Sequence, residues 1–406
     1  MSKKLTVKNV VKINKSTLSS KDNWSTLKYL DTGNITENQI NTLQIFQKGE
    51  KLPSRAKRKV EKGTIIYSTV RPNQKHFGYF DTYSNDLVVS TGFATLDVID
   101  PRVNSKYLYY LLTQNSVISQ LQSIGENSTS SYPSIRPEDI GNLSFMFPDI
   151  DIQTKIADIL TSIDKKIQIN NQINQELEAM AKTLYDYWFV QFDFPDQNGN
   201  PYKSSGGQMV YNPELKREIP EGWGVEKLGD FSQYVSEKVD SSELNIENYV
   251  GTDNMIADMG GIVLTTLIPK SGTSTKFSVG DILISNIRPY FKKIWLSDRT
   301  GGCSADVLCI RTKKIIPEEF VYATLARDDF FNYDVAGSKG SKMPRGDKKH
   351  IMEYPIVFEL GIVEQYSKIA RPIYEAVHEN NNQNQELTQL RDWLLPMLMN
   401  GQVKVE

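Results

Sequence analysis

The sequence contains few of the residues from which metal and redox centres are built. It has two cysteines, Cys303 and Cys309, and three histidines among 406 residues. Because both thiols fall in one expected strand region, they are predicted to be buried and reduced rather than joined in a disulfide. Cysteine and histidine do not cluster, so no zinc site is expected either.

Long apolar runs are missing as well. No stretch approaches the roughly 20 residues needed to cross a bilayer. No apolar signal core follows the N-terminal residues Met1–Lys4. We therefore expect a cytoplasmic protein without a membrane partner.

The chain also lacks motifs for catalysis. There is no Asn/Asp-Pro-Pro-Tyr/Phe tetrad to hold a flipped adenine, and the nearest string, Asn200–Tyr202, lacks one proline. No Gly-rich cofactor loop and no Gly-Lys-Ser/Thr phosphate loop occurs. Asp149 and the string Asp164–Lys166 match a metal-dependent nuclease on paper, but Asp164 falls in an expected helix rather than on a rigid sheet. The sequence predicts a protein that has no cofactor and catalyses no reaction itself.

Charge is distributed locally rather than globally. An apolar content of 39% and a charged content of 24% are typical of a globular protein, and 406 residues suffice for two to four domains. The net charge of −2 gives no support for a nucleic-acid partner. Two basic runs, Lys48–Lys62 and Lys339–Lys349, are either phosphate-binding surfaces or solvated faces.

Two long heptad patterns dominate what is present. Between Ile152 and Trp188 one row consists of Ile156, Ile163, Asn170, Leu177 and Leu184, and a second of Ile152, Ile159, Lys166, Ile173, Met180 and Tyr187. Near the C-terminus one row consists of Ile373, Asn380, Leu387 and Leu394, and a second of Ile362, Ile369, Ala376, Gln383, Leu390 and Met397. The alternating spacing of four and three residues predicts helices that pack against another helix.

These two stretches are related to each other. The motif Asn-Gln-Glu-Leu occurs at 174–177 and again at 384–387, and each copy has an asparagine near mid-helix, Asn170 and Asn380. A polar residue in a heptad row costs stability but fixes the register of pairing. We expect the two helices to pair with each other. The alternative is two unrelated amphipathic surface helices.

The rest of the chain repeats in the same order. The matching pairs are Tyr29–Ile35 with Tyr249–Met255, Gly63–Pro72 with Gly280–Pro289, Tyr107–Leu112 with Phe320–Leu325, Pro133 with Pro344, and Phe147 with Phe358. Strands are predicted at 64–70, 87–98, 281–287 and 306–311, and short helices at 106–121 and 318–331. Each half is therefore an α+β globular part followed by a long helix.

Five parts follow from this pattern. We expect globular parts at 1–150 and 223–360, long helices at 151–190 and 361–406, and a connector at 191–222 that is rich in turn formers. The first 20 or so residues are polar and are expected to be loosely ordered.

The repeat resembles the DNA-specificity subunit of type I restriction–modification systems over essentially all 406 residues. The motifs that carry the resemblance are the Ile219–Trp223 opening, Trp188–Phe194, Gly280–Leu283, the helix starts Gln153–Ala157 and Gln365–Ala370, and the C-terminal run Arg391–Gly401. Residues 1–25 depart from the pattern, because they contain no Pro-Glu-Gly-Trp opening.

The resemblance implies a fold and a function. Two target-recognition domains would sit at opposite ends of an antiparallel coiled coil with pseudo-twofold symmetry, and each would read one half of a bipartite, asymmetric site in double-stranded DNA. The helix pair would set the spacing and dock two methyltransferase subunits that modify adenine with S-adenosylmethionine. Translocating nuclease subunits, which use ATP and Mg, would join them. This chain would be the non-catalytic specificity subunit.

Candidate DNA contacts come from the repeat and the basic runs. Arg71 and Arg288 follow strands at matching places, and arginine grips a phosphate or a guanine edge with two parallel hydrogen bonds. The alternative is a structural arginine paired with a carboxylate. The other candidates are Asn73, Lys75, Tyr290, Lys292 and Lys293 just beyond them, Arg55, Lys57, Arg58 and Lys59 in the first run, and Lys339, Lys342 and Arg345 in the second. Each can contact either a phosphate or a base.

Two other functions fit the same features. The chain could be the recognition part of a methylating endonuclease whose catalytic chain is separate, in which case its partners differ. It could also be a coiled-coil scaffold whose basic runs are mere surface. A binding constant that falls with salt, together with sequence preference, would exclude the scaffold.

Overall fold

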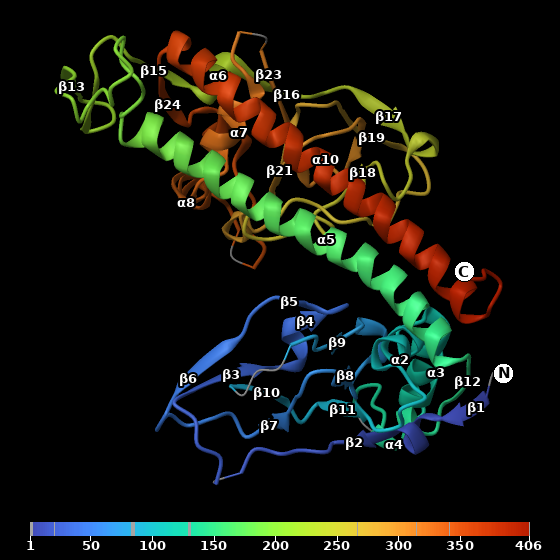
Figure 1. Cartoon of the computed structure of the whole chain (residues 1–406). Coiled ribbons are helices and arrows are strands. Elements are labelled where there is room, and N and C mark those ends of the chain that lie inside the picture. Colours follow the sequence, from blue (N-terminus) through green and yellow to red (C-terminus); the bar gives the residue numbers. More distant parts are fainter. Residues whose placement is uncertain are drawn as a thin grey trace. The chain divides into compact units, whose positions relative to one another are not determined.

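The computed structural model describes residues 3–19, 21–82, 86–128, 131–265, 267–313, 315–340 and 342–405. The chain divides into two compact units (Figure 1). Unit 1 consists of Met1–Gln168 and Asn384–Glu406, and unit 2 of Ile169–Gln383. Each unit contains one globular part. We call residues 3–147 the first head and residues 224–358 the second head.

The described residues of the first head form two four-stranded sheets, two two-stranded sheets and four α-helices. One sheet has the order β6-β3-β10-β7 and the other β2-β11-β8-β9. The strands are β1 (Lys3–Thr6), β2 (Val11–Ile13), β3 (Thr26–Leu30), β4 (Ile35–Thr36), β5 (Gln39–Ile40), β6 (Gln44–Gln47), β7 (Ala56–Lys59), β8 (Ile65–Ser68), β9 (Phe77–Tyr79), β10 (Leu87–Ser90), β11 (Phe93–Val98) and β12 (Ser144–Phe147). The helices are α1 (Val7–Val10), α2 (Ser105–Leu112), α3 (Asn115–Glu126) and α4 (Pro137–Gly141), of which α1 is a single turn.

The second head repeats this plan. Its sheets have the orders β16-β23-β20-β21 and β17-β19-β22-β18. The strands are β15 (Gly224–Lys227), β16 (Ser232–Tyr234), β17 (Lys238–Asp240), β18 (Tyr249–Val250), β19 (Thr273–Phe277), β20 (Ile282–Ser285), β21 (Ile294–Leu296), β22 (Gly301–Cys303), β23 (Val307–Thr312) and β24 (Pro355–Phe358). The helices are α6 (Leu228–Phe231), α7 (Glu318–Leu325), α8 (Asp328–Gly337) and α9 (Lys348–Met352).

The register of the strands confirms the internal repeat. β8 pairs with β9 and β11, and β20 pairs with β21 and β23 in the same order. All four residues of β8 and of β20 are buried, as expected for short apolar β-branched runs. Both strands begin just after a glycine with positive φ, Gly63 and Gly280, where other residues would be strained. The α+β fold class predicted from the sequence is correct.

The expectation that the first 20 residues are loosely ordered is wrong for those that the structure describes. β1 forms an antiparallel pair with β12, and β15 pairs in the same way with β24. Val7 and Val10 on α1 are completely buried. The polar sequence misled the prediction because β1 is held by backbone hydrogen bonds, which hydropathy does not report.

Three predicted elements are each two elements. The strand predicted at 87–98 divides into β10 and β11 around Thr91 and Gly92. The helix at 106–121 ends at Leu112 and resumes at Asn115 as α3, and the helix at 318–331 is likewise divided into α7 and α8. In each helix pair two residues, 113–114 and 326–327, separate the helices.

Two long helices run through both units. α5 spans Ile150–Tyr185 and continues into a π-turn at Asp186–Val190, while α10 spans Leu360–Met399. Within unit 2, Asn170 bonds Gln383 and Asn174 bonds Asn380 and Asn381; within unit 1, Asp164 bonds Arg391. Residue numbers rise on one helix as they fall on the other, so in each unit the helices are antiparallel, as predicted.

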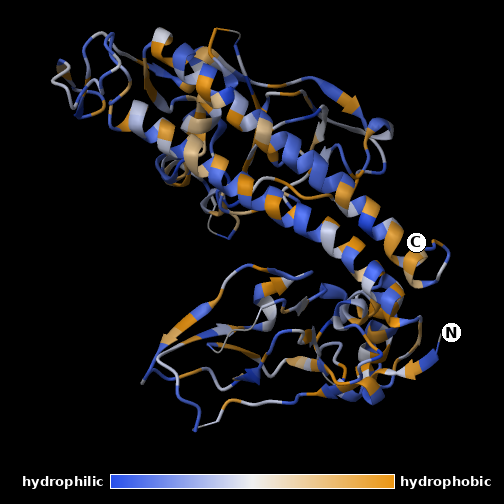
Figure 2. Ribbon diagram, in the orientation of Figure 1, coloured by the Kyte–Doolittle hydropathy of each residue, from blue (hydrophilic) through white to orange (hydrophobic). Residues whose placement is uncertain are grey.

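One predicted row of each helix is displaced by one residue. Ile152, Ile159, Ile173, Met180 and, on α10, Ile369 and Leu390 are exposed by 37–58% rather than packed in a seam. The buried row on α5 is instead Gln153, Leu160, Ile167, Asn174, Ala181 and Trp188. The row containing Ile156, Ile163 and Asn170 is buried as predicted. Apolar residues therefore remain on the outer surface of both helices, where Figure 2 shows them in orange.

An amide layer lies in the middle of the helix pair. Asn170 Nδ2 donates to Gln383 Oε1, Asn174 Nδ2 donates to Asn381 Oδ1, and Asn380 Nδ2 donates to Asn174 Oδ1, each at 2.8 Å. Lys166, which belongs to the predicted second row of α5, is exposed. Buried amides stabilise only the register in which their partners meet, so the layer fixes the alignment of α5 with α10.

The connector between the heads contributes to the core. It carries the hairpin β13 (Met209–Asn212) and β14 (Arg217–Pro220). Phe192 and Phe194 are 2% and 5% exposed and pack against Trp223.

The two cysteines are buried and form no disulfide, and burial raises the pKa of Cys303 to about 12.

Candidate nucleic-acid interface

The two matched arginines begin the same unusual turn in both heads. Arg71–Lys75 and Arg288–Lys292, which we call the arginine turns, each form one 3-10 turn after a buried strand. The first and last residue of each turn are left-handed, with φ of 47° and 55° in the first head and 52° and 51° in the second. Non-glycine residues rarely adopt this conformation, because it costs free energy. Where it does occur, it is concentrated at functional sites.

A second segment supports each arginine turn. We call Tyr132–Ser134 and Met343–Arg345 the proline loops, after Pro133 and Pro344. The backbone N–H of Arg71 donates to the carbonyl of Pro133 at 2.8 Å, and that of Arg288 donates to Pro344 at 2.8 Å. Each proline loop also forms an antiparallel bridge to the residue before the arginine. Two segments distant in sequence thus fix each arginine from both sides.

In the first arginine turn the arginine lies over an aromatic ring. The guanidinium carbon of Arg71 lies 4.4 Å from the centroid of the Tyr132 ring. Asn73 is exposed, and its backbone N–H donates to Gln122. Lys75 instead forms an ion pair with Glu37, so its charge is already neutralised.

The second arginine turn is more open. Arg288 is exposed, and no carboxylate of the described chain lies within ion-pairing distance of it. Tyr290 is exposed and packs on Phe291 with ring centroids 4.8 Å apart. Lys292 is paired with Asp328, which raises the pKa of the lysine, and Lys293 donates to the carbonyl of Thr252. Of these residues, Arg288 and Tyr290 are best placed to meet a ligand.

The basic run of the first head lies on β7. Arg55 directly precedes β7. Its backbone carbonyl accepts a hydrogen bond from the backbone N–H of Thr91, which lies beside the end of β8 and near the arginine turn. Lys57 is exposed, Arg58 is half-buried and Lys59 is paired with Asp22. Because β7 leads away from the arginine turn, the structure places Arg55 near Arg71 and the other three farther along the strand.

The basic run of the second head lies on and beside the proline loop. Lys339 bridges to Arg345, and Arg345 bridges to Ile287, so these residues and Arg288 lie on one surface. Lys339 pairs with Asp347 and Arg345 with Asp306, whereas Lys342 is exposed. Exposed ion pairs of this kind contribute little to stability.

Sequence reasoning missed the residues that flank the arginines. Tyr132 and Met343 are 56% and 48% exposed although both are large and apolar. They precede Pro133 and Pro344, the matched prolines, and that position is the signal that could have identified them.

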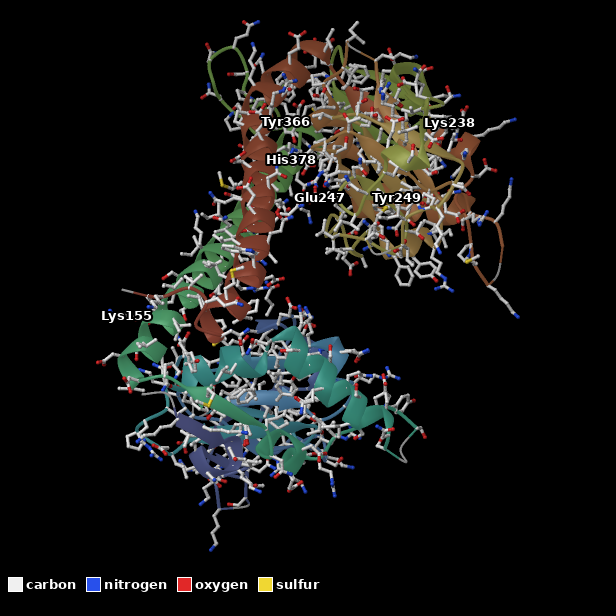
Figure 3. All side chains as sticks on the ribbon, turned by 90° about the vertical axis from the view of Figure 1, so that its right-hand side faces the viewer. Lys155, Lys238, Glu247, Tyr249, Tyr366 and His378 are labelled. Atoms are coloured by element: carbon white, nitrogen blue, oxygen red, sulfur yellow. The ribbon has the colours of Figure 1, made fainter. Side chains whose placement is uncertain are left out.

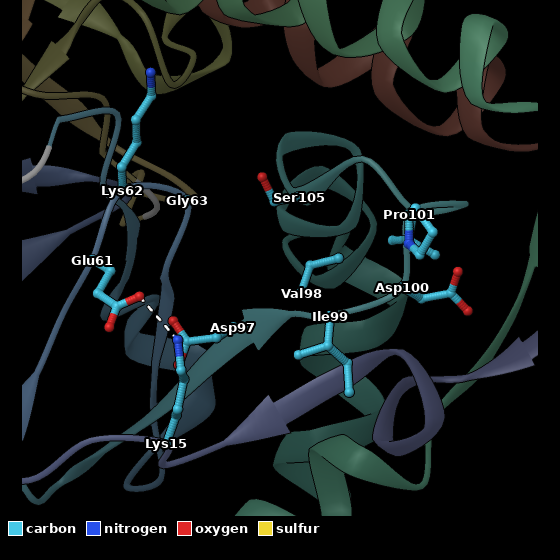
Figure 4. Close-up of a pocket in the computed structure, with 11 residues that line it drawn as sticks. Lys15, Glu61, Lys62, Gly63, Asp97, Val98, Ile99, Asp100, Pro101 and Ser105 are labelled. Carbon is cyan, nitrogen blue, oxygen red and sulfur yellow. Dashed lines mark hydrogen bonds and ion pairs between the residues drawn. The ribbon is translucent and has the colours of Figure 1, made fainter.

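The first head also contains a cavity. It measures about 390 Å³ and lies between β2, β11 and the start of α2 (Figure 4). Lys15 and Glu61 form an ion pair at its wall, and burial raises the pKa of the neighbouring Asp97 carboxyl. The cavity lies at the edge of the sheet opposite to Arg71, because β8 and β11 are antiparallel.

The aromatic cluster at the end of α5 is mainly internal. Tyr185, Trp188 and Phe189 are 3–6% exposed and pack against Phe320 and Tyr366. Their neighbour Tyr187 is 37% exposed and reaches the surface. Tyr366 and His378 of α10, both labelled in Figure 3, also belong to unit 2, and burial lowers the pKa of His378. Tyr185, Trp188 and Phe189 therefore belong to the core of unit 2.

Other kinds of site find no support in the described residues. No group of three or more histidine, cysteine or acidic side chains is arranged to hold a metal ion there. No described helix is long and apolar enough to cross a bilayer. Asp164, part of the nuclease-like string, is engaged by Tyr110 at 2.6 Å and Arg391 at 3.1 Å.

Known proteins share this architecture. The family model of the type I restriction modification DNA specificity domain matches residues 2–179. The HindI specificity subunit of Haemophilus influenzae is 26% identical over 92% of this chain and 94% of its own length. The MjaIX specificity subunit of Methanocaldococcus jannaschii is 26% identical over 93% of this chain and 84% of its own.

A solved structure agrees at the level of the fold. The S subunit of a type I restriction–modification system from M. genitalium matches 98% of this chain and 96% of its own, with a TM-score of 0.56 and 14% identity. The same order of elements occurs twice in the present chain, and the relatives match it over nearly its full length. In sequence the chain is therefore similar, over more than nine tenths of its length, to DNA specificity subunits of type I restriction–modification systems.

Proposed function

We propose that this chain recognises a specific sequence in double-stranded DNA as the non-catalytic subunit of a type I restriction–modification complex. The observation that carries the proposal is the matched pair of arginine turns, each placed by a buried strand and a proline loop. Because the two heads are repeats with different side chains around the arginine, each reads a different half-site. The recognised site is then bipartite and asymmetric.

The long helices serve as spacer and docking surface in this proposal. α5 and α10 are continuous helices, and the amide layer fixes their register, which suits a spacer. The exposed apolar row of α5 suits contact with two methyltransferase subunits. S-adenosylmethionine, ATP and Mg belong to the partners, including the translocating nuclease subunits, and the complex acts in the cytoplasm.

Replacing Arg288 with Ala should weaken specific DNA binding of the assembled complex by about 1–3 kcal/mol, since a bidentate arginine contact is lost. Competition titrations with specific and unrelated duplexes at fixed salt measure this change. Arg102→Ala is the matched control. Arg102 follows β11 at the edge of its sheet opposite to Arg71, and among the described residues its side chain forms an ion pair with Asp100. Unchanged affinity of the Arg288 variant would exclude the proposed role.

Replacing Met180 with Asp should weaken assembly with the methyltransferase subunits by about tenfold or more, because a charge would be placed in an apolar contact. Met180 is 58% exposed, so the isolated chain should keep its fold. Analytical ultracentrifugation of the mixed subunits measures the effect. Gln175→Asp, at another exposed position of α5, should assemble normally. Normal assembly of both variants would reject this docking surface.

A further inference from the structure

A series of ion pairs connects the first arginine turn to the long helix α10. Lys75, the last residue of the turn, pairs with Glu37 in the hairpin between β4 and β5. Glu37 Oε2 in turn lies 3.8 Å from Nη2 of Arg391 on α10. All three residues belong to unit 1. We call them the ion-pair chain.

Backbone hydrogen bonds hold the hairpin against the arginine turn as well. The backbone N–H of Glu37 donates to the carbonyl of Lys75 at 2.9 Å, and that of Asn38 donates to Phe77 at 2.9 Å. Glu37 and Asn38 are left-handed, with φ of 46° and 67°. Non-glycine residues keep this conformation only where their surroundings hold them in it. A contact that fixes the hairpin therefore also fixes the end of the arginine turn.

Arg391 is itself held from the side away from the hairpin. Its Nη1 donates to Asp164 of α5 at 3.1 Å, and the Tyr110 hydroxyl donates to the other oxygen of that carboxylate at 2.6 Å. The Arg391 side chain is 19% exposed. A cavity of about 180 Å³ is lined by Arg391, Glu37 and Lys75, among other residues. Since side chains do not fill this space, ion pairs contribute more than packing does to the junction there.

The second head has a similar arrangement with a different carboxylate. Lys292, the last residue of its arginine turn, pairs with Asp328 at 2.7 Å. This pair holds the pKa of Asp328 below its usual value, and Lys182 of α5 lowers it further. In both heads a carboxylate thus interacts with the lysine that ends the arginine turn and with a basic residue near the C-terminal end of a long helix.

We propose that Arg391 is a positioning residue for DNA recognition, which fixes the first arginine turn to α10 through Glu37 and Lys75. This inference rests on the proposed function. The charges of Lys75 and Glu37 cancel, so this pair holds the turn rather than attracting phosphate. Arg71 then meets its half-site in an orientation that α10 sets, and loss of Arg391 lets that orientation vary.

The test uses the complex assembled with its methyltransferase subunits and duplexes in which one base pair of the recognition site is changed at a time. Arg71→Ala and Arg288→Ala first identify the half-site that each head reads. Arg391→Met should then reduce discrimination about fivefold in the half-site identified by Arg71→Ala, the size expected for a residue that acts through others. It should leave the other half-site unchanged. Competition titrations at fixed salt measure both effects.

Glu37→Gln is the second variant, because it breaks the middle of the ion-pair chain. The side chain of Glu37 is 34% exposed, so the head should keep its fold. The variant should show the same loss in the same half-site, and combining it with Arg391→Met should add little, since both break one series of contacts. Lys15→Met is the matched control. It breaks the partly exposed ion pair with Glu61 in the wall of the 390 Å³ cavity, and it should discriminate like wild type.

An Arg391→Met complex that discriminates like wild type, or that loses discrimination equally in both half-sites, would overturn the inference. If that complex does not assemble, Glu37→Gln alone decides in the same way, because Glu37 contacts both Lys75 and Arg391. Unchanged discrimination by Arg71→Ala and Arg288→Ala would instead contradict the proposed function, so the two failures are distinguishable.

Discussion

Replacing Arg311 with Met is expected to lower the free energy of unfolding of the second head by about 3–5 kcal/mol, because it leaves a buried carboxylate without its partner. Asp281 is 1% exposed. Arg311 Nε and Nη2 lie 2.7 Å from its two carboxylate oxygens, and Nη1 lies 2.7 Å from Glu237. This arrangement raises the pKa of Arg311.

The first head shows how the same position works without the ion pair. Thr64 and Asp97 occupy the places of Asp281 and Arg311, and Thr64 Oγ1 donates to Asp97 at 2.5 Å. Thr64 and Asp281 both accept a backbone N–H from three residues earlier. Threonine can therefore replace Asp281 locally. The double variant Asp281→Thr, Arg311→Met should recover most of the stability lost by Arg311→Met.

Hydrogen exchange of the amides of β20 and β23 in the full chain measures these changes locally. Lys227→Ala is the control, because its ion pair with Glu353 is exposed on both sides, and exposed pairs contribute little. If Arg311→Met changed the opening free energy by less than about 1 kcal/mol, the carboxylate of Asp281 would not depend on the arginine.

The architecture could be predicted because it is repeated. Apolar β-branched runs between glycine and Arg-Pro identified β8 and β20, and the duplicated heptads identified α5 and α10. The register of the second row could not be predicted, because two rows of α5 satisfy the same spacing. The buried row contains Gln153, whose amide bonds the backbone of Arg102, Asn104 and Pro148. Such partners come from tertiary structure and are invisible to a hydropathy pattern.

The candidate site could be predicted from the sequence only in part, because the partners of its side chains also come from tertiary structure. The sequence indicated Arg71 and Arg288 because they repeat, but Lys75 and Lys292 looked equally open. Their carboxylate partners, Glu37 and Asp328, lie 38 and 36 residues away in the chain, so only the fold brings them together. Tyr132 and Met343 were missed because exposure of an apolar side chain cannot be read from its type.

Replacing Asp334 with Leu is expected to stabilise the second head by about 2–3 kcal/mol at pH 7. Asp334 is completely buried on α8, and neither carboxylate oxygen has a hydrogen-bond partner among the described residues. Burial raises the pKa of Asp334 to about 6, and a rise of that size from 3.8 opposes the ionised form by about 3 kcal/mol. Helix α3 of the first head has the same spacing of buried residues as α8. Its fully buried Leu121 follows two adjacent buried residues, as Asp334 does on α8.

The sign of the pH dependence follows from the raised pKa. The fold accommodates the protonated carboxyl of Asp334. Its contribution to the free energy of unfolding is therefore fully present below about pH 4 and is lost as the pH rises through 6. The gain in stability of Asp334→Leu over wild type should therefore shrink as the pH falls from 7 to 4. His350, which lowers the pKa of Asp334, is present in both proteins. Asp334→Asn should gain less than Leu, because its amide remains buried without a partner.

Hydrogen exchange of β20 and α8 in the full chain, measured at several pH values, tests this expectation. A Leu variant that is less stable than wild type at pH 7 would show that the carboxylate has a stabilising partner after all. Gly346 packs against Asp334, and a Cβ there would lie 2.4 Å from its Oδ1. Since Gly346 follows Arg345 on the proline loop, the variant should also be assayed for DNA binding. A stable variant with weakened binding would mean that the buried charge is retained for its effect on the reading surface, at the expense of stability.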